Sequence, residues 1–514
     1  MKKMFLIMSV VVVASMLLVS CGTAATPTTA APATQPPATQ PPVATATQPP
    51  VAANTAAPTV PAATPTLTPY PLATAEAGKV QVRWYIGLGT GTDAGQLPIE
   101  QSVVDDFNAS QSKIQLIMEV IPYASAKDTL ATEIASGAGP DIVGPVGWAG
   151  SNAFYGEWAD LAPLIKANNF NTSVYDSSLV SMYQTESGQV GLPFAIYPSA
   201  MEYNTALFDQ AGLNYPPATY GTQYKMPDGS MVDWTWANMT KVAQLLTVDK
   251  NGKNSTESGF DKTNIVQYGF SFTDENQPEY WGAYWQAGSE LVPGGAKGTY
   301  KAAIPQQWKD AWQWMYTGIW GDQPYIANNA VETSADFGSG NTFNSGKIAM
   351  TVEPSWYTCC MGNVKTWDFA AMPTYNGKVG GRIDADTFRI LKTSQHLNEA
   401  FQAMAYLETT GVQKLIVGTA TQAPAYGAIP AIAADRQPYL TNFAKNYPWV
   451  KNLNTLITGL KYPDHPSAEG WVPNFSEAWN RNSTFGNLLV TTSGLDLAKE
   501  EATLESDLTT IYNK

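Results

Sequence analysis

Histidine, cysteine and charged residues are scarce in this chain of 514 residues. It holds two histidines, His396 and His465, and three cysteines, and only 14% of its residues are charged. Neither histidine belongs to a cluster, and no Ser/His/Asp order, Cys/His metal spacing or glycine-rich phosphate loop stands out. We therefore expect no catalytic residue, no bound metal and no cofactor.

Long apolar runs are also rare, and the one that exists is N-terminal. Lys2 and Lys3 precede an apolar run from Met4 to Val19, which is too short to span a membrane as a mature helix and is typical of a secretory signal. The run ends in Leu18-Val19-Ser20-Cys21, which resembles the bacterial lipobox. That resemblance implies a lipoprotein signal peptide at 1–20 and a lipidated Cys21, which would hold the protein at the outer face of the cytoplasmic membrane. An ordinary cleaved signal with an incidental cysteine is the alternative.

Residues 21–78 lack the composition of a folded domain. From Gly22 to about Glu76 the chain consists almost entirely of Thr, Pro, Ala and Gln, which bury too little apolar surface to offset the entropy of ordering. Proline keeps such a chain extended at about 3.1 Å per residue. We predict a disordered tether over 21–78 and a folded part from about Lys79 to Lys514.

Basic residues are outnumbered in the expected mature chain. Without Lys2 and Lys3 it carries 27 basic against 43 acidic residues, a net charge of −16. This balance argues against nucleic acid and polyanionic ligands. Tryptophan and tyrosine together number 41, which suits a secreted protein with aromatic-lined surfaces.

The first folded segment alternates strands and helices. Residues 80–85 and 113–121 have the pattern of strands, 98–110 and 125–136 that of helices, and 141–143 that of a short third strand. Such an order with short loops predicts a parallel α/β sheet. Ligands bind at the carboxyl ends of such strands, so the loops after Tyr85 and Val143 are the expected site.

Several segments, in order, resemble the extracellular solute-binding proteins of carbohydrate ABC importers, the maltose-binding-protein-like class (family 1). They are SGAGPDI at 136–142, GLPF at 191–194 with MEYN at 201–204, GKIAMTV at 346–352 with Trp356, and MP at 372–373 with GG at 380–381. The resemblance implies an α/β, two-lobe periplasmic-binding-protein-like clamp with three crossovers, preceded by the disordered stalk. The implied N-lobe comprises 79–194 and 367–410, and the implied C-lobe comprises 195–366 and 411–514.

The same resemblance implies a function. The chain would capture a carbohydrate between its lobes, with an oligosaccharide favoured by the aromatic richness, and deliver it to the permease subunits of an ABC transporter. It would act as a monomer without catalysis, and without nucleic acid as a partner. The alternatives are a secreted carbohydrate-active enzyme, which would need paired carboxylates, and a sugar-binding surface adhesin.

Sugar sites need flat aromatic platforms and side chains that form hydrogen bonds with hydroxyl groups. Trp356 matches the tryptophan that follows the family's strand, and Trp148 follows the third predicted strand. Asp141 is expected to brace its loop, and Asp384 is expected on a solvated surface. For each aromatic candidate, packing in the core is the competing interpretation. The predicted ligand-binding residues are Tyr85, Trp148, Tyr197, Tyr284, Trp285, Glu353, Trp356, Asp386 and Tyr426.

Two adjacent cysteines, Cys359 and Cys360, follow Trp356 by three and four residues. Outside the cell such a pair forms a vicinal disulfide or stays as two thiols, and the sequence leaves both open.

Overall fold

The computed structural model describes residues 73–514, apart from 186, 273–276, 286–297, 420 and 463–471. The predicted signal peptide, Cys21 and most of the predicted tether lie outside the described residues. Within the described ranges, no helix is long and apolar enough to cross a bilayer.

Three parallel strands begin the fold, as predicted. β1 (Val80–Ile86) pairs with β2 (Ile114–Val120) along its whole length, from Val80 opposite Ile114 to Ile86 opposite Val120. The end of β1 also pairs in parallel with β3 (Ile142–Val146). The connecting helices are α2 (Leu97–Ser110) and α3 (Tyr123–Ser136). Short strand–helix–strand connections of this kind require a parallel sheet with its loops at one edge.

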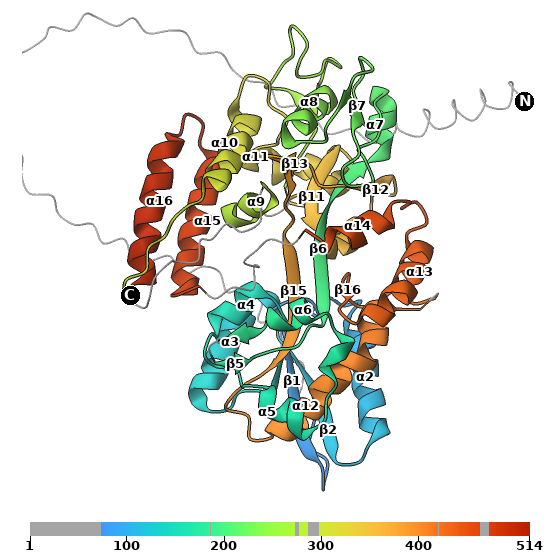
Figure 1. Cartoon of the computed structure of the whole chain (residues 1–514), viewed down its shortest axis with the longest axis vertical. Coiled ribbons are helices and arrows are strands. Elements are labelled where there is room, and N and C mark those ends of the chain that lie inside the picture. Colours follow the sequence, from blue (N-terminus) through green and yellow to red (C-terminus); the bar gives the residue numbers. More distant parts are fainter. Residues whose placement is uncertain (1–72, 186, 273–276, 286–297, 420, 463–471) are drawn as a thin grey trace, which may run out of the picture. The chain divides into compact units, whose positions relative to one another are not determined.

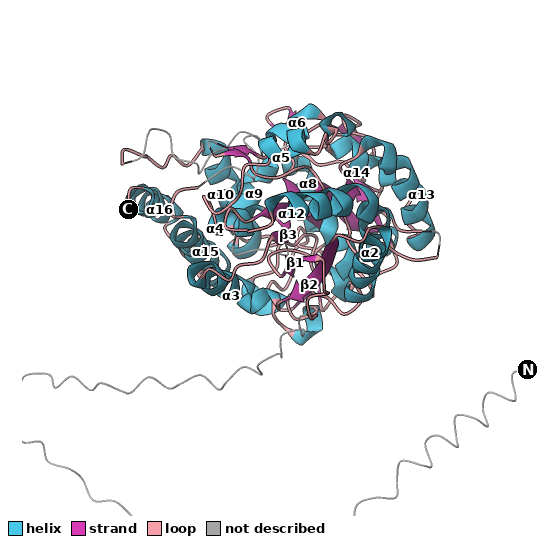
Figure 2. Ribbon diagram, turned by 90° about the horizontal axis from the view of Figure 1, so that it is seen from below, coloured by secondary structure: helices cyan, strands magenta, loops and turns pink. Residues whose placement is uncertain are grey.

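Alternate residues of β1 face two different helical layers. Val82, Trp84 and Ile86 pack with α2 and α12 (Leu397–Tyr406) in one core cluster. Tyr85 points to the opposite face, where it belongs to a separate cluster with α3. The two layers follow from the period of two along a strand, and Figure 2 shows α2 and α3 on opposite sides of β1 and β2.

Two longer strands connect this sheet to the rest of the molecule. The first half of β6 (Ala195–Asn204) pairs with β15 (Ile383–Ile390), and its second half pairs with β11 (Met350–Pro354) and β12 (Trp367–Ala370). The second half of β15 pairs with β3. One sheet with the order β11-β6-β15-β3-β1-β2 therefore runs through the whole folded part, and β6 and β15 extend between its two ends (Figure 1).

We call the part around β1, β2 and β3 the N-lobe and the part around β11 and β12 the C-lobe. The N-lobe also holds α4 (Trp148–Ala153), α5 (Ala162–Ala167) and α6 (Ser177–Ser181). β12 pairs with the C-lobe half of β6, whereas the second half of β15 pairs with the N-lobe strand β3. This pairing favours a crossover of the chain from the C-lobe to the N-lobe within β15. The predicted boundaries at 194, 366 and 410 stay predictions.

The C-lobe is built mainly from helices rich in aromatic residues. In α10 (Gln306–Trp320), Trp308, Trp312, Met315 and Ile319 are all buried, which confirms that this stripe is core packing. The other helices of this lobe are α7 (Thr205–Ala211), α8 (Trp236–Leu246), α9 (Pro278–Trp285), α11 (Asn329–Glu332), α15 (Phe475–Thr491) and α16 (Leu497–Tyr512).

The remaining elements are short strands and connecting helices. Two-stranded ribbons are formed by β4 (Gln184–Thr185) with β5 (Gly188–Gln189), β7 (Tyr224–Lys225) with β8 (Met231–Val232), β9 (Val248–Asp249) with β10 (Ile265–Gln267), and β13 (Thr374–Tyr375) with β14 (Lys378–Val379). β16 (Ile429–Pro430) pairs with β6 and is followed by α13 (Arg436–Asn446) and α14 (Leu453–Gly459).

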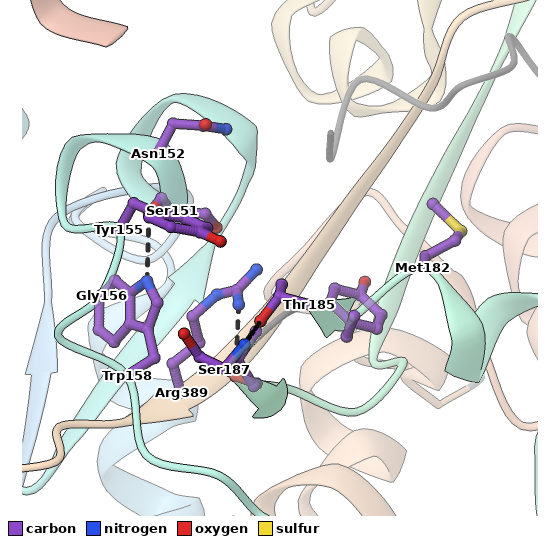
Figure 3. A pocket seen from close by; sticks show the side chains of 11 residues that line it. Ser151, Asn152, Tyr155, Gly156, Trp158, Met182, Thr185, Ser187 and Arg389 are labelled. Atoms are coloured by element: carbon purple, nitrogen blue, oxygen red, sulfur yellow. Dashed lines mark hydrogen bonds between the residues drawn. The ribbon is translucent and has the colours of Figure 1, made fainter. Parts of the chain in front are cut away.

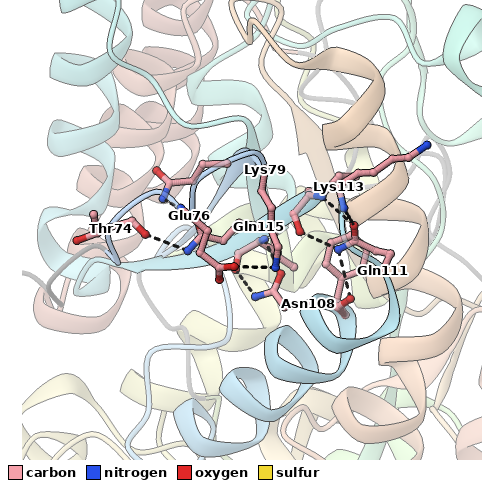
Figure 4. Close-up of polar contacts among 11 residues, drawn as sticks. Thr74, Glu76, Lys79, Asn108, Gln111, Lys113 and Gln115 are labelled. Atoms are coloured by element: carbon pink, nitrogen blue, oxygen red, sulfur yellow. Dashed lines mark hydrogen bonds and ion pairs between the residues drawn. The ribbon is translucent and has the colours of Figure 1, made fainter.

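The chain joins the folded part a few residues before Lys79. The amide N–H of Glu76 donates to Gln115 Oε1 at 2.7 Å, and Gln115 Nε2 donates to the carbonyl of Thr74 at 3.0 Å (Figure 4). Lys79 Nζ lies 2.7 Å from Glu76 Oε2. Residues 74–79 are therefore fastened to the edge strand β2.

Candidate functional site

A cavity of about 400 Å³ is lined by residues of both lobes and of the strands that connect them. Its N-lobe wall includes the loops after β1 and β3, which confirms that the carboxyl ends of these strands border a hollow. Its lining residues are Leu88, Gly89, Thr90, Gln96, Tyr123, Gly147, Trp148, Ala149, Gly150, Tyr197, Tyr280, Trp356, Arg382, Asp384, Asp386 and Gly427.

Two other hollows fit a solute site less well. A wider one of about 640 Å³ lies entirely in the C-lobe, where Trp285, Trp314 and Tyr375 line it, and it draws on no N-lobe residue. A small N-lobe pocket of about 30 Å³ has room for little more than a water molecule. In that pocket, shown in Figure 3, Trp158 Nε1 donates to the carbonyl of Ser151 at 3.1 Å, and Arg389 is a further lining residue.

Three polar groups of the cavity form a fixed unit. Arg382 Nε and Nη2 each donate to the Asp384 carboxylate at 2.6 Å, one to each oxygen. Trp356 Nε1 donates to Asp384 Oδ2 at 3.0 Å. The guanidinium carbon of Arg382 lies 3.2 Å from the centre of the Tyr280 ring. Charge-assisted bonds of this length hold the Trp356 ring and the Arg382 guanidinium in place.

Asp386 lines the same cavity, two residues farther along β15. Two glycines leave room for its carboxylate, because a Cβ at Gly147 would lie 2.4 Å from Asp386 Oδ1 and one at Gly89 would lie 3.1 Å from Oδ2. Burial raises the pKa of Asp386 to about 7, and the charge of Asp384 adds to this while Arg382 opposes it. The carboxyl group is therefore close to its titration midpoint at neutral pH.

The loop after β1 is held by Gln96, whose side-chain amide accepts two hydrogen bonds and donates two. Its Oε1 accepts from the backbone N–H groups of Gly91 (2.9 Å) and Asp93 (3.1 Å). Its Nε2 donates to Thr90 Oγ1 (2.8 Å) and to the carbonyl of Ala425 (3.0 Å). One side chain thus connects the cavity loop after β1 to the loop that precedes β16.

The loop before β16 is fixed at a second point. Tyr426 OH donates to Glu100 Oε1 at 2.7 Å, and both side chains are buried. Burial raises the pKa of Glu100 to about 8, the bond from Tyr426 opposes the shift, and the charge of Asp93 adds to it. Glu100 is therefore mostly a neutral acid at pH 7, which is how a carboxyl group is tolerated in this core.

Trp148 bridges the two lobes. Its ring centre lies 5.0 Å from that of Phe475, 5.4 Å from that of Trp479 and 6.4 Å from that of Tyr280. Two hydrogen bonds flank this aromatic cluster, one from Lys127 Nζ to Ser476 Oγ and one from the N–H of Val472 to Asn152 Oδ1, both 2.8 Å long. The first turn of α15 is thereby attached to α3, and the residues just before it are attached to α4.

The structure brings four of the predicted ligand-binding residues to this cavity: Trp148, Tyr197, Trp356 and Asp386. It places the other five elsewhere. Tyr85 is fully buried, and its hydroxyl donates to the carbonyl of Ala126 at 2.6 Å. Tyr284 and Glu353 are buried in the C-lobe, Trp285 borders the wider hollow, and Tyr426 is bonded to Glu100.

Asp384 corrects the expectation of a solvated surface acid. Only 18% of its side chain is exposed, and both of its oxygens accept hydrogen bonds inside the cavity. By contrast, Asp141 does brace its loop: Oδ2 accepts from the N–H of Arg83 at 2.9 Å and Oδ1 from Ser394 Oγ at 2.6 Å.

Several lining residues are absent from the predicted ligand-binding set, among them Tyr280, Arg382 and Gln96. A signal exists for Arg382, because it lies directly before β15 and alternates with Asp384 and Asp386, so that the three share one face. Tyr280 carried no such signal, since its approach to Arg382 joins segments about a hundred residues apart.

The paired cysteines follow Trp356 in a short 3₁₀ segment, Ser355–Cys360. The side chain of Cys359 lies outside the described residues, so the vicinal disulfide stays a prediction. Among the described residues, no group of three His, Cys, Asp or Glu side chains is arranged to hold a metal ion.

Comparison with known proteins places this geometry in a family. Residues 91–414, more than half of the chain, match the model of the bacterial extracellular solute-binding proteins. A binding protein of Brucella abortus (strain 2308) is 24% identical over 349 residues, which span 63% of this chain and 74% of that protein.

Solved structures share the fold. An ABC substrate-binding protein of Listeria monocytogenes in complex with cycloalternan has a TM-score of 0.63 and 18% identity, covering 84% of this chain and 98% of that one. A cyclic α-maltosyl-1,6-maltose binding protein of Arthrobacter globiformis has a TM-score of 0.61 and 16% identity, covering 85% and 100%. The maltodextrin-binding domain of Bdellovibrio bacteriovorus bound to maltotriose has a TM-score of 0.57 and 16% identity, covering 84% and 99%. These similarities confirm the α/β fold of the periplasmic binding proteins, and the chain belongs to the bacterial extracellular solute-binding proteins.

Proposed function

We propose that this protein is the extracellular receptor of an ABC importer and that it captures a carbohydrate, an oligosaccharide in particular, in the cavity between its lobes. The observation that carries the proposal is the composition of that cavity. Aromatic rings of Trp148, Tyr197, Tyr280 and Trp356 line it together with the carboxyl groups of Asp384 and Asp386, and sugars require this combination of flat apolar rings and hydrogen-bond acceptors.

The size of the cavity agrees with this function. About 400 Å³ lies within the range of roughly 300–1,000 Å³ that is usual for small-molecule sites. Three proteins of the same fold are described as bound to, or binding, cycloalternan, cyclic α-maltosyl-1,6-maltose and maltotriose, all of them oligosaccharides.

Capture and release would use the strands between the lobes. β15 pairs with the N-lobe strand β3 through its second half and with β6 through its first half, and the second half of β6 pairs with the C-lobe strand β11. Small changes of backbone angle within two such strands would part the lobes and expose the cavity, as in hinge motions generally. The closed form would then be presented to the permease subunits.

The enzyme alternative has one observation in its favour, the pair of acids Asp384 and Asp386 in the cavity. Glycoside hydrolysis needs two carboxyl groups with separate roles as acid and as base or nucleophile. Asp384, however, already accepts three hydrogen bonds from Arg382 and Trp356, which hold its carboxylate against the cavity wall. This arrangement favours binding over hydrolysis.

A thermal-shift screen tests the proposal. The purified protein is heated with maltotriose, cyclic glucose oligosaccharides and a panel of monosaccharides, and the wells are then analysed for cleavage products. A sugar at a hundred times its Kd adds about 2.7 kcal/mol to the free energy of unfolding, enough for a clear shift. A selective shift without products supports the receptor, products support the enzyme, and no shift with any sugar overturns the carbohydrate assignment.

Lipid anchoring is proposed from the sequence alone. Cys21→Ser should move the protein from the membrane fraction to the culture supernatant without changing its sugar binding. A variant that stays in the membrane fraction would contradict an anchor at Cys21. A permease that transports the identified sugar only in the presence of this protein would support the importer assignment.

A further inference from the structure

The described lining of the cavity holds two carboxyl groups and one guanidinium group. Among its described lining residues Arg382 carries the one permanent positive charge, and Asp384 and Asp386 carry the carboxyl groups. Arg382 is compensated inside the cavity wall, because it donates to both oxygens of Asp384 at 2.6 Å and its guanidinium lies on the Tyr280 ring. Its side chain is only 6% exposed. A negatively charged solute therefore finds no free cation there.

The carboxyl group of Asp386 takes no part in the pairing of Arg382 with Asp384. Among the described residues, none donates a hydrogen bond to its carboxylate, although backbone of both cavity loops lies against it at Gly89 and Gly147. It is partly exposed, and its exposed side faces the cavity. A carboxylate in this position accepts hydrogen bonds from a solute and attracts positive charge.

We infer that Asp386 makes the cavity select solutes by charge, so that a sugar bearing a basic amino group binds more tightly than its neutral parent and one bearing a carboxylate or phosphate binds more weakly. The inference rests on the proposed function and narrows its substrate class. The aromatic lining is compatible with the same preference, because aromatic rings such as those of Trp356 and Tyr197 attract cations at their faces. Burial and the charge of Asp384 raise the pKa of Asp386 to about 7, so the selection is to be measured at pH 7.5 or above, where the ionised form prevails.

A matched series of sugars tests the inference. Maltotriose is compared with derivatives that carry an amino group, or a carboxylate, at carbon 6 of every ring, so that the orientation in the site does not matter. Calorimetric titration of the whole purified protein should give at least a tenfold lower Kd for the amine than for maltotriose, and at least a tenfold higher Kd for the acid. If a different neutral oligosaccharide binds best in the screen, the series is built on that sugar.

Variants assign the effect to one residue. In Asp386→Asn the three sugars should differ by less than threefold. Asp336→Asn makes the same change of net charge at an exposed C-lobe residue outside the cavity and should keep the wild-type order. A circular dichroism spectrum and a thermal transition show whether each variant is folded, and the wild-type series tests the inference even if one is not.

The outcomes separate the two proposals. Binding of the neutral sugar with equal affinity for the amine and the acid overturns the charge selection and leaves the receptor assignment standing. Unchanged selection in folded Asp386→Asn overturns the role of Asp386. Binding by none of the neutral oligosaccharides overturns the carbohydrate assignment and this inference with it.

Discussion

Gly147→Ala tests whether the Asp386 carboxylate contacts the solute, because it displaces that carboxylate without altering it. The Cβ of an alanine at 147 would lie 2.4 Å from Asp386 Oδ1, whereas ordinary contact begins at 3.4 Å. The carboxylate must therefore move by about 1 Å or rotate. Gly147 itself has φ −95° and ψ −166°, which alanine adopts without strain, so the backbone need not respond.

The expected change in stability is small. Rotation of a side chain away from its preferred torsion costs about 0.5–1.5 kcal/mol. The lower conformational entropy of the unfolded alanine variant offsets about 0.4–1 kcal/mol of this. The free energy of unfolding should therefore change by less than about 1 kcal/mol.

The expected change in binding is much larger. A hydrogen bond to a charged group contributes about 1.5–3 kcal/mol. If the displaced carboxylate can no longer accept a hydrogen bond from the sugar, the Kd for that sugar should rise about 10- to 150-fold. Calorimetric titration of the best neutral oligosaccharide of the screen, together with thermal unfolding without sugar, measures both quantities.

Gly95→Ala is the matched control. Gly95 lies in the loop between β1 and α2, and a Cβ there would meet nothing within 4 Å. Its binding and stability should equal those of the wild type. If Gly147→Ala binds the sugar as tightly as Gly95→Ala does, the Asp386 carboxylate is no ligand contact and the reasoning fails.

Three further predictions concern other parts of the site. Trp356→Ala should abolish most binding and leave the thermal transition without sugar nearly unchanged, since Trp356 is only partly buried; a large loss of stability would show a core residue instead. The folded-state pKa of Glu100 is about 8 against an ordinary value of 4.5, so its neutral form is favoured by folding. The stability it contributes is full below pH 4.5 and is lost as the pH rises to about 8; thermal unfolding from pH 5 to 8 should therefore show a decline that is shallower in Glu100→Gln, and identical slopes would contradict the shift. Trp479→Ala removes a ring that holds Trp148 across the lobes without lining the cavity, and should raise the sugar Kd severalfold and increase the radius of gyration of the unliganded protein in X-ray scattering; no change in either would show that this contact does not hold the lobes together.

The fold was predictable because its signals are local. The strand–helix–strand order over residues 80–146 follows from hydrophobic periodicity and turn residues, and so does the position of the loops that border the cavity. The buried stripe of α10 follows from a period of 3.6 in the same way.

The site was predictable only in part, because it depends on which face of a strand meets the cavity. Tyr85 is the last residue but one of β1, at the expected edge, but its side chain points to α3. Alternation along a strand does not by itself say which of its two faces meets a solute. Trp285 and Tyr280 lie on the same helix, α9, yet they border different hollows. Such choices are made by tertiary packing between distant segments.

β15 offered the clearest missed signal. Arg382, directly before this strand, shares one face with Asp384 and Asp386 by the period of two, so the sequence pattern groups the three together. The expectation of a solvated Asp384 is wrong because it treats this residue as a lone acid in a loop, whereas its bond to Trp356 spans 28 residues of sequence.

The measurement that tests the central claim most directly is calorimetric titration of the oligosaccharide panel into the wild-type protein and Trp356→Ala. We predict saturable binding of one sugar molecule per wild-type chain and its loss in the variant, with both proteins folded. Absence of binding by every oligosaccharide, or equal affinity of the two proteins, would contradict a carbohydrate site in this cavity.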